Sequence, residues 1–125
     1  MNIVPKVRSS SYNRTMGVDH TTKLHHPERD EIELPGVLHA LSDPQRLEIV
    51  RRLAGSDEPC ACGSIKLGVS KSTMTHHFRV LRESGVIRQK REGTSKLTEL
   101  RREDLDARFP GLIDAVLSSD SVAVG

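Results

Sequence analysis

The stretch VSKSTMTHHFRVLRESGVI, residues 69–87, restricts the fold of this chain more than any other segment. Ser70 is a typical N-cap residue, Gly85 is a typical helix end, and the residues between them divide into two faces at helical spacing. The core-facing side would carry Met74, His77, Phe78 and Leu81. The opposite side would carry Ser72, Thr75, His76 and Arg79. The segment therefore predicts a helix with one buried face and one polar, basic face.

A shorter helix is expected immediately before this one. It would run from about Cys62 to Leu67, and Gly68 with Val69 would then form a tight turn. Two short helices joined by a turn that contains glycine, the second capped and polar on its outer side, have the outline of a helix-turn-helix.

Two more helices are predicted upstream. The first covers residues 34–41, where apolar side chains repeat at i, i+3, i+4 and i+7, and the second lies between Asp43 and Gly55. Asp43, or Ser42 as the alternative, is the expected N-cap of the second helix, and Pro44 suits its first position. The apolar stripe of the first helix consists of Leu34, Val37, Leu38 and Leu41.

Downstream, the pattern predicts a β-hairpin and a last helix. In residues 86–100 a charged stretch is flanked by the apolar residues Val86, Ile87, Leu97 and Leu100, with Gly93 at the expected tip. A helical segment starts near Asp104, breaks at Pro110 and Gly111, and carries an apolar stripe to Leu117 without an obvious partner. We expect this stripe and the first helix to form a dimer interface. The expected fold class is mainly α with a small β-hairpin, a homodimeric winged helix-turn-helix.

The length of 125 residues fits one domain. We expect a flexible arm over residues 1–30, because this part is polar and shows no sustained period. The DNA-binding and dimerisation domain would then cover residues 31–118, and residues 119–125 would form a disordered tail. Either Met1 or Met16 is compatible with being the biological start.

Charge is distributed unevenly along the chain. The formal net charge is only +2, but residues 60–101 carry nine Lys or Arg against three Glu. This segment therefore has a charge of +6, and the remainder of the chain has a charge of −4. A basic middle between neutral and acidic flanks indicates one positively charged surface that faces a polyanion.

No apolar run is long enough to span a membrane, and the first residues lack the pattern of a secretory signal. We therefore expect a cytoplasmic protein. In that reducing compartment its two cysteines, Cys60 and Cys62, are not expected to form a structural disulfide. Three interpretations stay open: idle thiols, reactive thiols and metal ligands.

Three stretches carry a family resemblance: LSDPQRLEIVRRL, SKSTMTHHFRVLRESGVI and the REGTSK hairpin. Over residues 34–100, their order and spacing strongly resemble the arsenical-repressor (ArsR) family of bacterial transcription factors. The resemblance implies a homodimeric winged helix-turn-helix repressor of transcription that leaves its DNA operator when an inducer binds, often a metal ion. It implies no enzyme.

DNA contacts are expected from the predicted helix and the hairpin, because a helix fits the major groove and basic residues bind phosphates. The helix residues expected at DNA are Lys71, Ser72, Thr73, Thr75, His76 and Arg79. The hairpin residues expected at phosphate or in the minor groove are Arg88, Lys90, Arg91 and Lys96. Arg79 and His76 are the candidates for base reading, whereas His77 is expected to be a packed, hydrogen-bonded core residue.

Cys60 and Cys62 stand close to the place where metal-sensing members of the resembled family carry a Cys-x-Cys pair. Two thiolates suit zinc or another thiophilic divalent metal but do not close a tetrahedral site. The missing ligands would be histidines of the arm, His20, His25 or His26. Gly63 departs from the sensor pattern, where an acidic residue is expected, and oxidation of the thiols is the alternative signal.

Two other function classes compete with a DNA-binding regulator. A winged helix that serves only as a protein-interaction module would carry an apolar recognition face, which Lys71 and Arg79 oppose. A small thiol enzyme would be expected to show a Cys-x-x-Cys spacing or a βαβ pattern, and this chain has neither.

Overall fold

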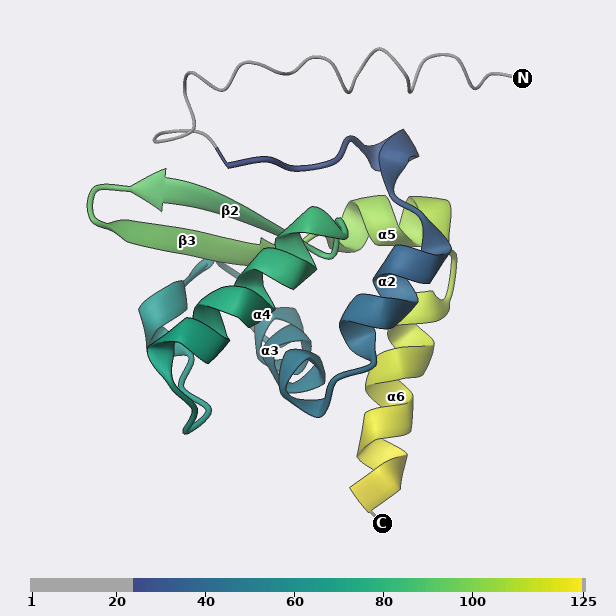
Figure 1. Ribbon diagram of the computed structural model, residues 1–125. Helices are drawn as coiled ribbons and strands as arrows, with labels where there is room; N and C mark the ends of the chain where they lie inside the picture. The colour runs from purple at the N-terminus through teal and green to yellow at the C-terminus, as the bar shows by residue number, and fades with distance from the viewer. Residues whose placement is uncertain (1–23, 125) are drawn as a thin grey trace.

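The protein is described by a computed structural model over residues 24–124, which forms helices around a small antiparallel sheet (Figure 1). The helical elements are the short 3₁₀ turn η2 (Arg29–Glu31), α2 (Leu34–Leu41), α3 (Pro44–Ala54), the 3₁₀ turn η3 (Cys62–Ser64), α4 (Lys71–Glu83), α5 (Arg102–Arg108) and α6 (Leu112–Val124). The strands are β1 (Cys60–Ala61), β2 (Ile87–Glu92) and β3 (Ser95–Leu100), in the order β1-β3-β2. This arrangement is the winged helix-turn-helix that the sequence predicts.

The predicted caps set the starts of the two central helices. The Oδ1 atom of Asp43 accepts hydrogen bonds from the backbone N–H groups of Gln45 at 2.8 Å and Arg46 at 3.2 Å. The hydroxyl of Ser70 accepts from the N–H of Thr73 at 3.1 Å. Asp43 is therefore the N-cap of α3, as preferred over Ser42, and Ser70 is the N-cap of α4.

The hairpin has the predicted position, but the sheet has a third strand. β2 pairs with β3 from Ile87↔Leu100 to Glu92↔Ser95, and Gly93 adopts a φ of 65° at the tip. Cys60 and Ala61 pair with Thr98 and Leu97. The helix expected from about Cys62 to Leu67 is therefore wrong in extent. Cys60 and Ala61 form strand β1 because their backbones pair with β3, and only Cys62–Ser64 of the expected helix are helical, as η3.

The core lies where α2, α3, α4 and the base of the hairpin meet. Val37, Ile49, Leu81 and Ile87 are fully buried there. Gly85 links α4 to this base with a φ of 91°, and a Cβ atom at this position would lie 2.6 Å from Cγ1 of Ile32. Only glycine satisfies both the left-handed backbone and the close approach.

The outward faces of α2 and α6 differ from each other. In α2, Leu34 and Leu38 are exposed by 40% and 48%, although Val37 and Leu41 of the same stripe are buried. In α6, Ile113 is fully buried within the subunit. The expectation that the α6 stripe lacks an internal partner is therefore wrong at this position, and the exposed apolar surface lies on α2.

The described residues include part of both expected end segments. Residues 1–23 lie outside the described residues, but residues 25–27 contact β2, α4 and Arg101. The Nε2 atom of His26 accepts from the N–H of Gln89 at 3.0 Å, and Arg101 donates to the carbonyl of Pro27 at 2.8 Å. At the other end, α6 continues helically to Val124, although the sequence predicts a disordered tail from residue 119.

A carboxylate shared by three arginines holds these segments together. Asp104 accepts hydrogen bonds from Arg29 at 2.7 Å, Arg101 at 2.9 Å and Arg88 at 3.2 Å. Burial of Asp104 would raise its pKa, but the hydrogen bonds from Arg29 and Arg101 outweigh this effect and lower it.

Within residues 24–124, no helix combines the length and apolar character that crossing a membrane requires.

Candidate nucleic-acid interface

Helix α4 has two different sides, as the sequence predicts. His77, Phe78 and Leu81 are buried on the inner side. The exposed residues of the expected DNA face are Lys71, Ser72, Thr75, His76 and Arg79, with Thr73 partly buried. Because five polar and basic side chains share one surface of a single helix, they can approach the major groove together.

His77 forms part of the core instead of the DNA face. Its Nδ1 atom accepts from Nη1 of Arg46 at 3.1 Å, and its Nε2–H donates to Oε1 of Gln45 at 2.8 Å. Burial lowers the pKa of His77 from its ordinary value of 6.5, and the nearby Arg46 adds to the effect against the attraction of Asp43. The expectation of a packed, hydrogen-bonded histidine is confirmed.

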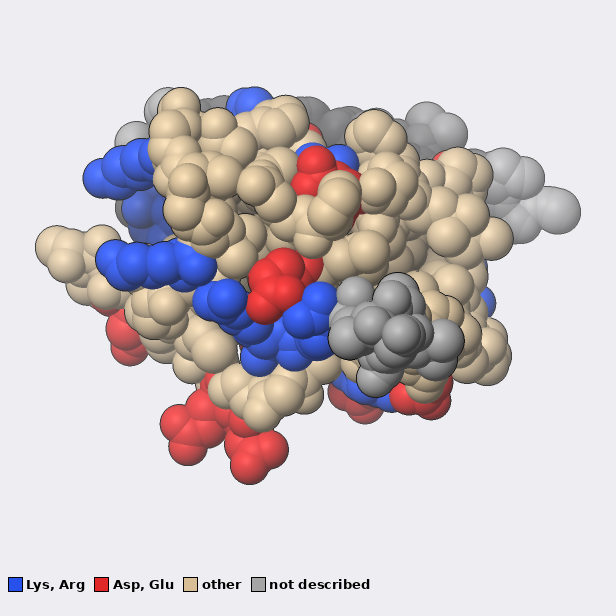
Figure 2. All heavy atoms as spheres, turned by 90° about the horizontal axis from the view of Figure 1, so that it is seen from below, with Lys and Arg blue, Asp and Glu red and all other residues tan. Residues whose placement is uncertain are grey.

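A basic cleft of about 490 Å³ lies between α4 and the hairpin. Its basic lining residues are Lys71, Arg79, Arg82 and Lys96, and no Asp or Glu of residues 24–124 lines it. Figure 2, a view from below, shows Lys and Arg side chains at the left edge of the molecule, with Asp and Glu side chains lower in the view. The cleft therefore concentrates positive charge where α4 and the hairpin meet.

The four expected hairpin residues occupy three different environments. Arg91 and Lys96 are cross-strand partners, and Lys96 reaches the cleft. Lys90 is exposed on the other face of β2, one residue away. Arg88 pairs with Glu99 at 3.4 Å and with Asp104 at 3.2 Å, so its charge is used at the base of the hairpin. Arg88 thus differs from Lys90, Arg91 and Lys96 because its charge is paired with carboxylates.

Arg82 is a cleft residue that lies outside the DNA face expected from the sequence. It follows Arg79 by three residues on α4, so helical spacing alone places the two on neighbouring turns. Its Nη1 donates to Oε1 of Gln89 at 2.8 Å, and its Nε donates to the carbonyl of His25 at 3.3 Å. Partial burial lowers the pKa of Arg82 from its ordinary value. The side chain joins α4 to β2 and lines the cleft.

Gln89 connects this arginine to the cysteine region. Its Nε2 donates to Sγ of Cys62 at 3.0 Å and to Oγ1 of Thr98 at 3.3 Å. Cys62 and Thr98 are themselves 2.9 Å apart between sulfur and oxygen. A continuous hydrogen-bonded network therefore runs from α4 through both long strands to η3.

The residues expected to bind metal are not assembled in one place. Cys60 contacts the carbonyl of Glu58 at 3.8 Å, whereas Cys62 belongs to the Gln89 network. His26 uses Nδ1 toward the carbonyl of Leu24 at 2.9 Å and Nε2 toward Gln89, and His20 lies outside the described residues. Within residues 24–124, no three His, Cys, Asp or Glu side chains are grouped as metal ligands. The described donors do not fit a zinc site.

Comparison with known proteins supplies independent information about this surface. Residues 41–90 match the model of a family described as a helix-turn-helix domain. The chain is 32% identical over 82 residues to the uncharacterized HTH-type transcriptional regulator YceK of Bacillus subtilis, covering 64% of this chain and 82% of that protein. It is 35% identical over 75 residues to the arsenical resistance operon repressor of Staphylococcus xylosus, covering 59% of this chain and 71% of that protein.

The fold also matches solved structures. The crystal structure of an ArsR family transcriptional regulator aligns with 77% of this chain and 96% of its own chain, at a TM-score of 0.55 and 22% sequence identity. At this identity the likeness concerns the fold alone. The structural match and the sequence relatives agree on a helix-turn-helix architecture, and the matched family model covers α4 and the first part of β2.

Proposed function

The chain belongs to the ArsR family of winged helix-turn-helix transcriptional regulators, and from this premise we propose that it is a cytoplasmic, homodimeric repressor. A DNA-binding regulator of this family has to present one helix to the major groove and a second element to the backbone. In this chain, α4 and the β2–β3 hairpin have the shape and the charge for those two roles. The basic cleft, whose described lining includes no acidic residue, carries the proposal.

We assign the roles by chemistry. Arg79 and His76 read base edges from the exposed side of α4. The guanidinium of Arg79 can donate two parallel hydrogen bonds to guanine. Lys71, Ser72, Thr73 and Thr75 contact phosphates around the start of the helix. On the hairpin, Lys90, Arg91 and Lys96 contact the backbone. Arg88, held by Asp104, contributes to the position of the hairpin more than to direct binding.

The exposed leucines of α2 support the proposed dimer. Leu34 and Leu38 lie one helical turn apart, and both leave large apolar side chains in water. A two-fold symmetric contact would bury both leucines of each subunit at once. Two copies of α4 would then face two half-sites about one helical turn of DNA apart, or a multiple of that distance.

The proposed function is tested by fluorescence anisotropy of the reduced, metal-free protein on DNA from upstream of its own gene. Tight binding that persists against an excess of random competitor DNA is the expected result. Binding that competitor abolishes would contradict a sequence-specific repressor, and the absence of any DNA binding would favour the protein-interaction module. A titration with zinc or cadmium in the same assay shows whether Cys60 and Cys62 make the complex metal-sensitive.

A further inference from the structure

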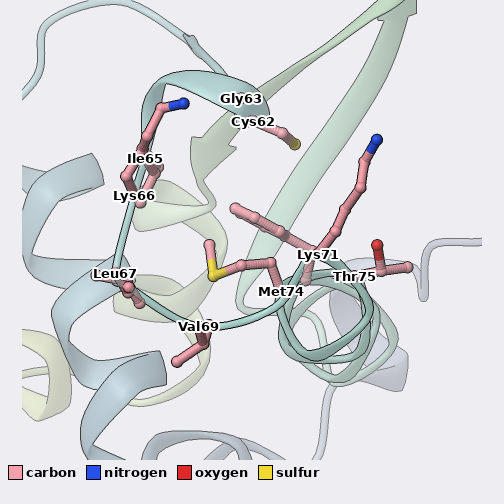
Figure 3. A pocket seen from close by; sticks show the side chains of 11 residues that line it. Cys62, Gly63, Ile65, Lys66, Leu67, Val69, Lys71, Met74 and Thr75 are labelled. Atoms are coloured by element: carbon pink, nitrogen blue, oxygen red, sulfur yellow. The ribbon is translucent and has the colours of Figure 1, made fainter.

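A second, mostly apolar cavity lies beside the basic cleft. It has a volume of about 550 Å³ and separates the start of α4 from the loop that leads into it (Figure 3). Its apolar side chains are Ile65, Leu67, Val69, Met74 and Phe78. A cavity of this size and lining is within the range that binds small organic molecules.

The charged residues of this cavity are all basic. Lys66 and Lys71 line it on two sides, and no Asp or Glu of the described chain is among its lining residues (Figure 3). Among residues 24–124, neither lysine takes part in an ion pair. An apolar chamber with unpaired ammonium groups at its border is complementary to a molecule that has an apolar body and one negative charge.

We propose that this cavity binds a small amphipathic carboxylate, with its apolar chain against Met74 and Phe78 and its carboxylate at Lys71. We propose further that this binding lowers the affinity of the protein for DNA. The second part rests on the proposed function. The class includes medium-chain fatty acids and aromatic acids with an apolar body.

The coupling to DNA follows from shared residues. Lys71 and Thr75 line both the cavity and the basic cleft. A carboxylate bound at Lys71 occupies a cation that DNA phosphate would otherwise use, and it adds a negative charge beside the path of the backbone. Because binding free energies are reciprocal, DNA must weaken the binding of the carboxylate by the same factor.

Cys62 gives a second route for the same coupling. It lines the cavity and the cleft, and its sulfur is hydrogen-bonded to Gln89 of β2 and Thr98 of β3. A ligand that displaces this side chain disturbs the contacts that fix the hairpin relative to α4. The distance between the basic residues of the hairpin and those of α4 would then no longer be fixed.

Octanoate is a suitable probe, and isothermal titration calorimetry of the full chain without DNA measures its binding. Lys71→Gln should weaken octanoate binding about two- to fivefold, as removal of a partly exposed ion pair does. Met74→Gln should weaken it about tenfold, because the lining becomes polar where the chain packs. Lys90→Gln on the hairpin is the matched control and should bind octanoate as the wild type does. Octan-1-ol, of the same length and neutral, should bind more weakly than octanoate.

The effect on DNA is measured separately, by anisotropy with and without saturating octanoate. Octanoate should raise the Kd for DNA in the wild type and much less in Met74→Gln. No saturable octanoate binding, equal affinity for octan-1-ol, unchanged affinity in Lys71→Gln and Met74→Gln, or binding without any effect on DNA would each overturn the proposal. Failure to bind DNA without octanoate would instead remove the proposed repressor, while calorimetry would still decide whether the cavity binds the carboxylate.

Discussion

His76 and His77 are neighbours in the chain but have opposite environments. His76 is exposed on the DNA side of α4, whereas His77 is 5% exposed and is hydrogen-bonded to Gln45 and Arg46. The helical period turns successive side chains by about 100°, so residue identity alone does not distinguish the two roles. Their position relative to Phe78 and Leu81 does, and this position is readable from the sequence.

The buried state of His77 makes stability depend on pH. Its pKa lies below 6.5 in the folded protein because burial disfavours the imidazolium. As the pH falls toward 6.5 and below, the unfolded chain therefore binds more protons than the folded protein does. The free energy of unfolding should therefore decrease from pH 7 to pH 5. Urea denaturation at both pH values should show a smaller decrease for His77→Gln than for the wild type.

His76→Gln is the matched control for this measurement, because it changes the adjacent but exposed histidine. It should keep the full pH dependence of the wild type. A wild-type difference that persists unchanged in His77→Gln would contradict the assignment. The carboxyls of Asp43 and Asp104 have pKa values lowered from 3.8, below this window, whereas burial also lowers the pKa of His26, which contributes equally to the pH dependence of all three proteins.

Arg79 should carry sequence preference as well as affinity. Replacing it with alanine should cost about 1–3 kcal/mol of discrimination between operator and random DNA, the usual value of a bidentate contact with a base pair. Competition anisotropy with both DNAs measures this difference. Glu83→Ala, one turn further along α4, should leave the discrimination unchanged. An equal decrease in affinity for both DNAs would make Arg79 a phosphate contact instead.

At the scale of elements, the helices are predictable and the small sheet is only partly so. The starts of α3 and α4 depend on Asp43 and Ser70, which act on backbone groups two or three residues away. Strand β1 depends on pairing of Cys60 with Thr98, which lies far along the chain. Nothing local in the Cys60–Ala61 pair indicates a strand, so the local pattern favours a helix nearby.

The candidate site shows the same division. The exposed face of α4 follows from helical spacing, but the cleft requires the hairpin to fold back toward that helix. Arg82 and Lys96 come together only then, and Arg88 is drawn away by Asp104, a residue of α5. The residues of the candidate surface that lie on one helix can therefore be predicted from the sequence. Those that depend on contacts between separate elements cannot.

The hairpin should supply affinity with little sequence preference. Lys90→Gln combined with Arg91→Gln should weaken binding to operator and random DNA about equally, because phosphate contacts are independent of sequence. The plot of log K against log salt concentration should flatten by about 0.9 for each phosphate that the variant no longer neutralises. Anisotropy at several salt concentrations gives this slope.

Arg51→Gln combined with Arg52→Gln removes the same charge from α3, where both side chains pair with Glu48, and serves as the control. It should leave the slope close to that of the wild type. An unchanged slope in the hairpin variant would mean that these two residues do not touch the DNA backbone.

At the scale of the whole molecule, the main unsatisfied surface of the described chain is the pair of exposed leucines on α2. Leu38→Asp should convert the proposed dimer into a monomer. A buried leucine contributes about 1.5–3 kcal/mol, and two-fold symmetry counts it twice, so the dimer Kd should rise by about a hundredfold or more. Sedimentation velocity over a range of protein concentrations measures this change.

His39→Asp places the same charge on an exposed neighbour in α2 and is the control for that substitution. It should remain dimeric. A wild-type protein that sediments as a monomer at micromolar concentration would contradict the proposed dimer. A dimer that tolerates Leu38→Asp would place the interface on another surface.

His26 contacts the outer edge of strand β2. β2 ends the sheet order, and an open edge strand is a template on which other chains can add and aggregate. The N–H of Gln89 is closed by Nε2 of His26, and burial lowers the pKa of this histidine, which keeps the nitrogen an acceptor at neutral pH. Protonation of His26 would turn this acceptor into a donor and break this hydrogen bond, whereas Arg101 would still hold the carbonyl of Pro27. One hydrogen bond at this edge of the sheet is therefore sensitive to pH, because its acceptor is an imidazole.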